Sequence, residues 1–517
     1  MKKIPLLALI FLPFAGIAQL VPTLVSDVNA GSDGSNPVAI TALGNEIVFQ
    51  AMNGSSNGLN LFRYKPGVGV AQISGTGAYS AIYDTYAPLW SFGVINNRLF
   101  FLTRYAPVLP SPTPGNGSTY SLAEGGIPQV VDTGVASLVT VFNPDLQTAL
   151  LGGKLYCWGT TTAGGFGLCY VNATNHLVLA APFNPSFEYS FSSELTACNN
   201  KIFFTASISG STILYVFDPA TNVFTAIDIP GSIGMDAAPR DLYGGDNNTL
   251  YFSAISSTDG RELYSYSAAG TVTKLTSLNT SADGVYKNPG DNFRSYNLIK
   301  FGNAIYFSGC NGLNGFDLMK YDLSTSTSSL IKDIALSTAS SKPHSFYIYS
   351  GKLYFVADNG SSGNELWVTD GTAANTTMVS DINPGITGSS PNSFCTMGSK
   401  MYFAADNGTA GREIFSYSGT GTPGAVASLE YGNNVVAYPN PAAGAFTVSI
   451  DLAEAAGLSI QLSDINGKQV YRQEEQQYAI GTNKIVIPLQ NFPAGVYFYS
   501  VFNAGLNRVA SGKINHK

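Results

Sequence analysis

Two glycine-rich loops carry oxygen ligands at matching positions. Asp358 and Glu365 bound the first loop, Asp406 and Glu413 bound the second, and both loops read D-N-G-x-x-G-x-E. Carboxylate oxygens at the two ends of such a loop suit Ca²⁺, although the pattern is shorter and less acidic than an EF-hand. Asn and Gly also form ordinary hairpin turns. Two interpretations stay open, a weak calcium site and a plain turn, and no other cofactor is expected.

Acid–base chemistry has few candidates elsewhere in the chain. A glycoside hydrolase would need two carboxylates facing each other, about 5–10 Å apart. Four scattered acids could lie near a central funnel, without a spacing that singles out a pair: Glu194, Asp236, Asp241 and Asp291. The three histidines lack the neighbours of a zinc site or a Ser-His-Asp triad: His176, His344 and His516. We therefore expect a non-catalytic protein, with a surface carbohydrate-active enzyme of glycoside hydrolase type as the alternative.

The five cysteines have irregular spacing, which is not the pattern of a disulfide framework. Cys157 and Cys169 fall on neighbouring strands of one predicted hairpin and could pair. The alternative is that all five are small buried hydrophobic residues.

The elements that carry these residues repeat along the chain. Short apolar-aromatic strand cores begin at residues 47, 99, 155, 202, 250, 305, 353 and 401, at intervals of 47 to 56 residues. A period near 50 residues built from strands is typical of a β-propeller, with one four-stranded blade per repeat. The cores are apolar on consecutive residues, which indicates strands covered on both faces. The sequence predicts an all-β propeller of about eight four-stranded blades, with seven as the alternative.

Residues 23–37 copy the pattern of residues 377–391, the junction after the seventh repeat. We expect the segment 23–29 to add an outer strand to the last blade and close the ring, because an open ring would leave unpaired strand edges. If residues 425–428 take that place, closure is by packing alone.

Both ends of the chain differ from the repeats. Lys2 and Lys3, the apolar residues 4–14 and a small-residue site between Ala18 and Gln19 predict a cleaved signal peptide. The last 80 or so residues alternate apolar and polar positions between turns, which suits a small Ig-like β-sandwich. The expected organisation is a signal peptide (1–18), a propeller (19–428), a linker (429–436) and a C-terminal domain (437–517).

The distribution of charge limits the classes of molecule that the protein can bind. The net charge of −7 is spread out, without the clustered Lys and Arg that nucleic acid needs. No other run is long and apolar enough for a transmembrane segment. The sequence predicts an exported monomer that works in adhesion or in binding an unknown glycan or protein.

The seventh repeat resembles the "ELWxxDGT" repeat of secreted bacterial proteins. It reads ELWVTDGT over residues 365–372 and D-I-N-P-G over residues 381–385. The fifth and eighth repeats match in part, at Glu262 and Glu413, and the first four have diverged. This resemblance implies an exported, propeller-like protein and no established activity.

The C-terminal segment resembles the type IX secretion sorting domain of Gram-negative bacteria. The matching residues are Tyr438, Pro439, Asn440, Pro441, Asp464, Gly467, Lys468, Gly495, Tyr497, Gly512 and Lys513. The resemblance implies that the type IX translocon carries the protein across the outer membrane. It also implies that the domain is then removed and that the protein is released or attached to surface lipid. An accessory Ig-like sandwich is the alternative.

Overall fold

The structure is a computed structural model in which every described element is a strand. It describes residues 21–54, 60–73, 93–103, 118–131, 138–139, 148–161, 166–172, 174–183, 189–208, 211–231, 237–279, 282–286, 297–419, 436–438, 441–452, 456–464, 469–479, 481–490, 492–503 and 508–517. The predicted signal peptide with Ala18 and Gln19, and most of the predicted linker, lie outside these residues.

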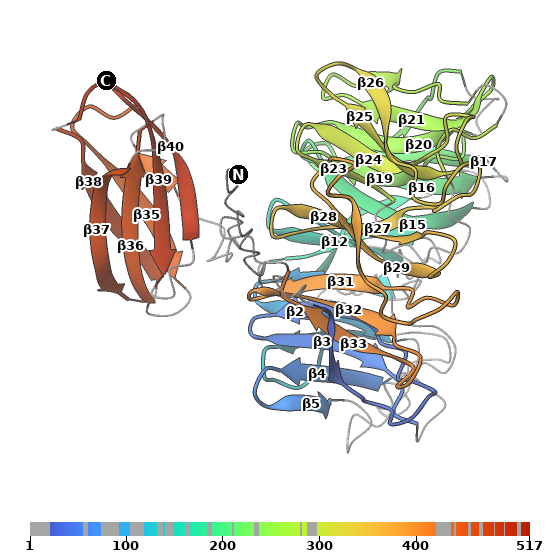
Figure 1. The fold of residues 1–517 in the computed structure, drawn as a ribbon, viewed down its shortest axis with the longest axis horizontal. Coiled ribbons are helices and arrows are strands. Elements are labelled where there is room, and N and C mark those ends of the chain that lie inside the picture. The colour runs from blue at the N-terminus through green and yellow to red at the C-terminus, as the bar shows by residue number, and fades with distance from the viewer. Residues whose placement is uncertain are drawn as a thin grey trace, which may run out of the picture.

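The repeats form antiparallel sheets, which we number in chain order (Figure 1). Sheet 1 contains β2 (Val38–Leu43), β3 (Glu46–Ala51), β4 (Asn60–Lys65) and β5 (Gly69–Gln72). Sheet 2 contains β6 (Gly93–Ile95), β7 (Arg98–Thr103), β8 (Ser118–Ala123) and β9 (Gln129–Val130). Sheet 3 contains β10 (Leu138–Val139), β11 (Ala149–Leu151), β12 (Lys154–Thr161), β13 (Phe166–Val171) and β14 (Leu177–Phe183). Sheet 4 contains β15 (Tyr189–Cys198), β16 (Lys201–Ile208), β17 (Ser211–Asp218) and β18 (Val223–Ile227).

The second half of the series repeats this order. Sheet 5 contains β19 (Arg240–Gly244), β20 (Leu250–Ser256), β21 (Gly260–Tyr266) and β22 (Val272–Lys274). Sheet 6 contains β23 (Leu298–Phe301), β24 (Ala304–Gly309), β25 (Asp317–Asp322) and β26 (Thr327–Lys332). Sheet 7 contains β27 (His344–Tyr349), β28 (Lys352–Asp358), β29 (Asn364–Thr369) and β30 (Thr377–Ser380). Sheet 8 contains β31 (Asn392–Met397), β32 (Lys400–Asp406), β33 (Arg412–Tyr417) and β1 (Thr23–Ser26).

The second strand is deeply buried in several of the sheets. Every residue of β3 and β24 is buried, as are the five central residues of β28. The predicted burial of both faces is confirmed for these strands, because apolar clusters fill the space between successive sheets. One such cluster joins Phe49 and Phe62 of sheet 1 to Tyr402 and Ile414 of sheet 8. The series of sheets is thus closed upon itself in a propeller-like arrangement.

The closing strand comes from the N-terminus. β1 pairs antiparallel with β33, with Thr23 opposite Ser416, and their hydroxyl oxygens are 3.1 Å apart. In Figure 1 the blue strands of sheet 1 lie beside the orange strands of sheet 8. The prediction that residues 23–29 supply the missing outer strand is confirmed. The alternative segment, residues 425–428, lies outside the described residues.

The C-terminal unit has a different burial pattern. One sheet contains β34 (Val436–Tyr438), β35 (Ala445–Leu452) and β38 (Gly481–Pro488), in that order. The other, in the order β37-β36-β39-β40, contains β36 (Ala456–Ser463), β37 (Gln469–Tyr478), β39 (Gly495–Asn503) and β40 (Arg508–His516). Alternate residues of both sheets, such as Val448, Ile460 and Val501, share one apolar core. Strands buried on one face are those of two sheets packed face to face.

Removing the closing strand tests its role. A protein that starts at Asn29 exposes the edge of β33 and should melt several degrees lower than wild type and aggregate more readily. Removal of residues 19–21 alone is the matched control and should leave the melting temperature unchanged. Equal melting temperatures for the two truncations would show that β1 does not stabilise sheet 8.

Candidate functional site

Glu365 is the charged residue of the ELW motif, and it is completely buried at the start of β29. One carboxylate oxygen accepts hydrogen bonds from the Asn383 N–H at 3.2 Å and the Ser389 N–H at 2.9 Å. The other accepts from the Ile382 N–H at 3.2 Å and the Ser389 hydroxyl at 2.5 Å. All of these donors belong to residues 381–391, which lead from sheet 7 to sheet 8. The carboxylate therefore holds the connection between two sheets.

Glu413 does the same at the closure of the ring. It is completely buried and accepts from the Ser35 N–H at 2.7 Å and the Ser35 hydroxyl at 2.6 Å. The Asn29 N–H lies 3.4 Å from the same carboxylate. The N-terminal segment thus repeats the contacts of residues 381–391, although it precedes Glu413 by hundreds of residues.

Two further acids complete a set that we call the junction carboxylates: Glu262, Asp317, Glu365 and Glu413. Glu262 accepts from the Thr276 hydroxyl at 2.5 Å and the Leu278 N–H at 2.9 Å. Asp317 accepts from the Ser341 hydroxyl at 2.5 Å and the Ile334 N–H at 3.1 Å. At the corresponding register positions, sheets 1 to 4 have Asn60, Ser118, Gly167 and Ile213. The set therefore occurs in sheets 5 to 8, the half of the chain in which the repeat is best kept.

Burial has the largest effect on the pKa of these acids. It raises the pKa of each junction carboxyl, and hydrogen bonds from the connecting residues lower it, with a net rise in all four. Glu262, Glu365 and Glu413 have donors on both carboxylate oxygens, whereas Asp317 accepts through one oxygen only. In this structure the junction carboxylates therefore act as hydrogen-bond acceptors for the connections between sheets.

A Ser-x-Pro sequence marks three of these junctions, and sequence reasoning did not assign it a role. It occurs at residues 35–37, 341–343 and 389–391. The middle residue has a positive φ each time, at Asn36, Lys342 and Ser390. The carbonyl of the Ser accepts from the last residue of the second strand of the next sheet or from the residue after it. The Asp406 N–H donates to Ser389 at 3.0 Å, and the Met52 N–H donates to Ser35 at 2.7 Å. The same Ser thus binds one sheet through its side chain and the next through its backbone.

The two proposed calcium loops have a different geometry from a cation site. Asp358 is paired with Asn364, and Ala357 is paired with Glu365. Because successive side chains of a strand point to opposite faces, Asp358 and Glu365 point away from each other. The second loop has the same register, with Asp406 opposite Arg412 and Ala405 opposite Glu413. No group of three potential metal ligands occurs among the described residues.

The exposed ends of both loops instead form turns. The Asp358 carboxylate accepts from the Gly360 N–H, and the Asp406 carboxylate accepts from the Gly408 N–H, both at 2.7 Å. These are local side-chain-to-backbone bonds of the kind that stabilise tight turns. The arrangement agrees with the plain-turn interpretation.

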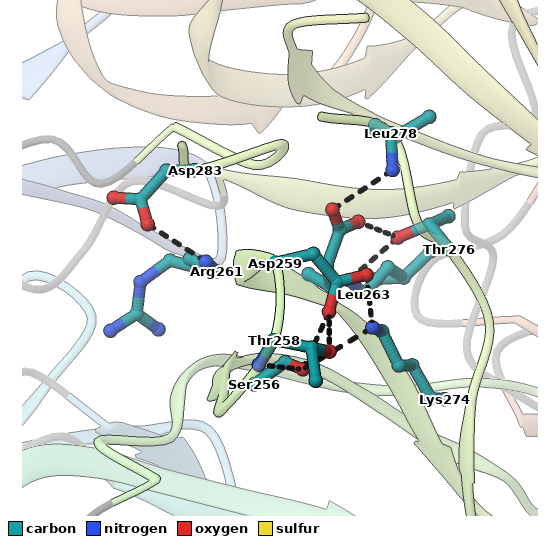
Figure 2. Close-up of polar contacts among 10 residues, drawn as sticks. Ser256, Thr258, Asp259, Arg261, Leu263, Lys274, Thr276, Leu278 and Asp283 are labelled. Carbon is teal, nitrogen blue, oxygen red and sulfur yellow. Dashed lines mark hydrogen bonds and ion pairs between the residues drawn. The ribbon is translucent and has the colours of Figure 1, made fainter. Parts of the chain in front are cut away.

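A second polar cluster braces the outer part of sheet 5 (Figure 2). The Asp259 carboxylate binds the Lys274 ammonium at 2.5 Å and the Ser256 hydroxyl at 2.7 Å, and it also accepts from the Thr258 hydroxyl. Burial alone would raise the pKa of Asp259, but Lys274 and the hydroxyl donors outweigh it and hold the pKa well below its usual range. A carboxylate of such low basicity is a poor general base near neutral pH. The cluster ties the β20–β21 hairpin to β22.

Of the four acids considered for a funnel, Asp241 is the one whose side chain is described. Asp236 and Asp291 lie outside the described residues, and the side chain of Glu194 is not described. Asp241 lies on β19 with φ +58°, and it accepts from the Ser253 hydroxyl at 2.7 Å and the Asn297 amide at 3.2 Å. It joins strands of sheets 5 and 6.

The sorting-motif residues that the structure describes are distributed over strands and connections of the C-terminal unit. Tyr438 is 41% exposed on β34, and Tyr497 on β39 is buried, with its hydroxyl donating to the Pro493 carbonyl at 2.7 Å. Gly512 and Lys513 lie in β40 and pair with Tyr499 and Phe498. Gly495 begins β39, Pro441 and Asp464 lie in connections, and Pro439, Asn440, Gly467 and Lys468 lie outside the described residues. The end of the chain is tied down by bonds between Ala442 and residues 515 and 517.

Comparison with known families identifies this unit. Residues 436–514 match the secretion system C-terminal sorting domain. The type IX sorting prediction is confirmed, and the protein is exported by a bacterium of the Bacteroidetes to the cell surface or the medium. The domain implies an interaction with the type IX secretion machinery. No helix in the described ranges has the length and apolarity that crossing a membrane requires.

Comparisons over the whole chain are more distant. No curated protein matches the chain. Among solved structures it is similar to PorZ, a surface component of the type IX secretion system of Porphyromonas gingivalis. The two share 12% identity, over 93% of this chain and 75% of PorZ, with a TM-score of 0.27. It is also similar to an oligogalacturonate lyase of Vibrio parahaemolyticus, with 9% identity over 78% of this chain and 94% of the lyase and a TM-score of 0.40. These similarities are low, and the strand pairing of this chain by itself defines the fold.

Replacing Glu365 tests the junction carboxylates. Glu365→Ala leaves several buried donors without an acceptor and should lower the unfolding free energy by about 3 kcal/mol. Glu365→Gln should cost about 1 kcal/mol, because the amide oxygen still serves two N–H groups and the Ser389 hydroxyl can turn to accept. Asp358→Ala, at the exposed end of the same loop, should cost less than about 1 kcal/mol. Urea denaturation measures all three, and equal effects of the Ala variants would contradict the assignment.

The raised pKa values predict a pH dependence. Just above the ordinary Glu pKa of 4.5, the unfolded carboxyl has lost its proton while the folded one keeps it. The contribution of Glu365 to stability is therefore fully present below this window and falls as the pH rises through it. Glu365→Gln cannot titrate, so its unfolding free energy should fall less than that of wild type between about pH 4.5 and pH 7. Carboxyls with lowered pKa values are present in both proteins, so their effects cancel in the comparison. If the unfolding free energy of the variant fell more steeply with pH than that of wild type, the raised pKa of Glu365 would be contradicted.

Proposed function

We propose that the protein is a non-catalytic, exported β-propeller of eight blades that binds a glycan or protein at or beyond the cell surface. Its C-terminal unit is an Ig-like sandwich that serves as the outer-membrane translocation signal. The sorting-domain match carries the proposal, because it places the protein where adhesion and recognition take place. The predicted domain bounds, with a cleaved signal peptide at residues 1–18, are part of the same proposal.

The structure of sheet 7 supports membership of the ELWxxDGT repeats. Glu365 is a junction carboxylate, Leu366 is completely buried, and the Trp367 ring stacks on Phe355 at a centroid distance of 6.4 Å. Asp370 closes a turn by accepting from the N–H and hydroxyl of Thr372 at 3.0 and 2.7 Å. Five of the six fixed letters of the motif, all except the Gly, thus have a role in building a blade. These structural roles are needed whatever the protein binds. We therefore expect residues of the loops to recognise the ligand.

One end of the propeller offers apolar side chains to a ligand. Leu313, Leu336 and Ile386 are 79%, 76% and 84% exposed. Leu313 lies on the hairpin between β24 and β25, and the other two lie on the connections that follow sheets 6 and 7. Antiparallel strand order places such hairpins and connections at the same end of the sheets, and the Gly315 N–H donates to the Ser337 carbonyl at 3.2 Å. Rigid sheets that carry variable loops are suited to recognition.

A binding experiment tests the proposal. The purified exported protein is applied to a glycan array and to outer-surface extracts, and a specific ligand should be retained. The triple change Leu313→Ser, Leu336→Ser and Ile386→Ser should weaken that binding at least about tenfold without changing the melting temperature. Val68→Ser, on the turn after β4 at the opposite end of sheet 1, is the matched control and should bind like wild type. Turnover of a polysaccharide together with no binding would replace this proposal with the carbohydrate-active enzyme.

A further inference from the structure

A cross-strand aromatic pair recurs in the sheets at one register position. The third residue of each second-strand core is Phe in seven sheets, and its partner on the third strand is aromatic in six of them. The pairs are Phe49–Phe62, Phe101–Tyr120, Phe204–Tyr215, Phe252–Tyr264, Phe307–Met319, Phe355–Trp367 and Phe403–Phe415. Several of these rings are stacked, for example Phe49 on Phe62 at a centroid distance of 5.6 Å. The position packs one sheet against the sheet before it.

Sheet 3 departs from this pattern at both partners at once. Cys157 occupies the Phe position of β12, and Cys169 lies directly opposite it on β13. Both side chains are buried, at 3% and 0% exposure, in the cluster that packs sheet 3 against sheet 2. The other three cysteines have no cysteine opposite them: Cys198 pairs with Lys201, Cys395 with Tyr402, and Cys310 follows β24. Simultaneous replacement of both members of a pair indicates that the two cysteines act together.

We propose that Cys157 and Cys169 form a disulfide in the exported protein, in place of the aromatic pair of the other sheets. Directly opposed strand residues have Cβ atoms about 4.5–5.5 Å apart, close to the 3.5–4.5 Å of a disulfide. In this structure both are free thiols, and the Cys169 sulfur lies 3.7 Å from the Gly167 carbonyl oxygen. Gly159, two residues after Cys157, leaves room for this sulfur, since a Cβ there would lie 2.9 Å from it. A rotation about the first side-chain torsion of Cys169 would turn its sulfur toward Cys157.

The chemistry is an ordinary thiol oxidation. The two thiols lose two protons and two electrons and gain one sulfur–sulfur bond, and a protein disulfide of the oxidising envelope compartment accepts the electrons and becomes a dithiol. Burial raises the pKa of both thiols, so the thiolate that must attack is disfavoured once the sheets have packed. The bond therefore forms while the β12–β13 hairpin is still open, and packing afterwards shields it from reductants.

The contact between sheets 2 and 3 has less aromatic packing than the corresponding contacts of the other sheets. Two cysteines fill much less volume than two aromatic rings, so this pair supplies less dispersion energy to the contact between sheets 2 and 3. A covalent bond restricts the unfolded hairpin instead and stabilises it by a different route. The cross-link thus serves the part of the ring in which the junction carboxylates are missing.

Differential alkylation of the protein recovered from the native host tests the inference. The protein is denatured in excess alkylating reagent without reductant and digested with trypsin, which releases residues 155–201 as one peptide, because no Lys or Arg lies between Lys154 and Lys201. This peptide contains Cys157, Cys169 and Cys198. We expect one label, located on Cys198 by fragmentation, and three labels after reduction. Three labels without reduction, or a label on Cys157 or Cys169, would overturn the proposal.

Two variants sharpen the result. In Cys169→Ser the thiol of Cys157 has no partner for a disulfide, so Cys157 and Cys198 should both be labelled without reduction. Wild type that is unfolded in reductant and refolded with its thiols reduced should melt a few degrees lower than untreated wild type. The double change Cys157→Phe and Cys169→Tyr restores the aromatic pair of the other sheets, and the same treatment should leave its melting temperature unchanged. Equal melting temperatures for treated and untreated wild type would count against the cross-link, independently of whether the protein binds a ligand.

Discussion

Hydrogen-bond donors that would otherwise be left unpaired in the interior are the constraint on which the ring depends. The connection that follows each of sheets 5 to 8 reaches the buried start of a third strand with N–H groups directed at its carboxylate. A carboxylate accepts several hydrogen bonds and donates none, so one Glu or Asp satisfies a whole group of donors. A buried charge is costly unless hydrogen bonds surround it. The backbone of the connection is therefore held in the course that brings its donors to the carboxylate. That path sets where the next sheet begins, and repetition of the same contact in sheets 5 to 8 gives successive sheets equivalent neighbours.

The strands were the most predictable part of this molecule. Consecutive apolar residues such as those of β28 have few alternatives to a strand covered on both faces, and the copy of residues 377–391 at the N-terminus predicted the closing strand. The use made of Glu365 and Glu413 was not predictable in the same way. A carboxylate at the end of a glycine-rich loop has the same appearance in a sequence whether it meets a cation or a set of N–H groups. The register of the hairpin decides between them, because it determines whether Asp358 and Glu365 share a face.

The two parts of the chain obtain their stability by different means. Sheets of the ring bury both faces against their neighbours, so no sheet has a core of its own. The C-terminal unit alternates buried and exposed positions and completes its core from its own strands, including Val448, Ile460 and Ile514. A self-contained core lets this unit present the same surface whatever protein precedes it. That property suits a sorting domain that is read by a secretion machinery.

β1 pairs with β33, the last strand of the ring along the chain, and this pairing affects the order of events in folding. Thr23 and Ser416 are 393 residues apart in the sequence, while the contacts within each hairpin are local. Loop-closure entropy makes such a distant contact slow to form compared with the hairpins. Sheets can therefore form one after another, but the circle remains open until β1 meets β33. Until then the edge of β33 is unpaired and sheet 8 is incomplete.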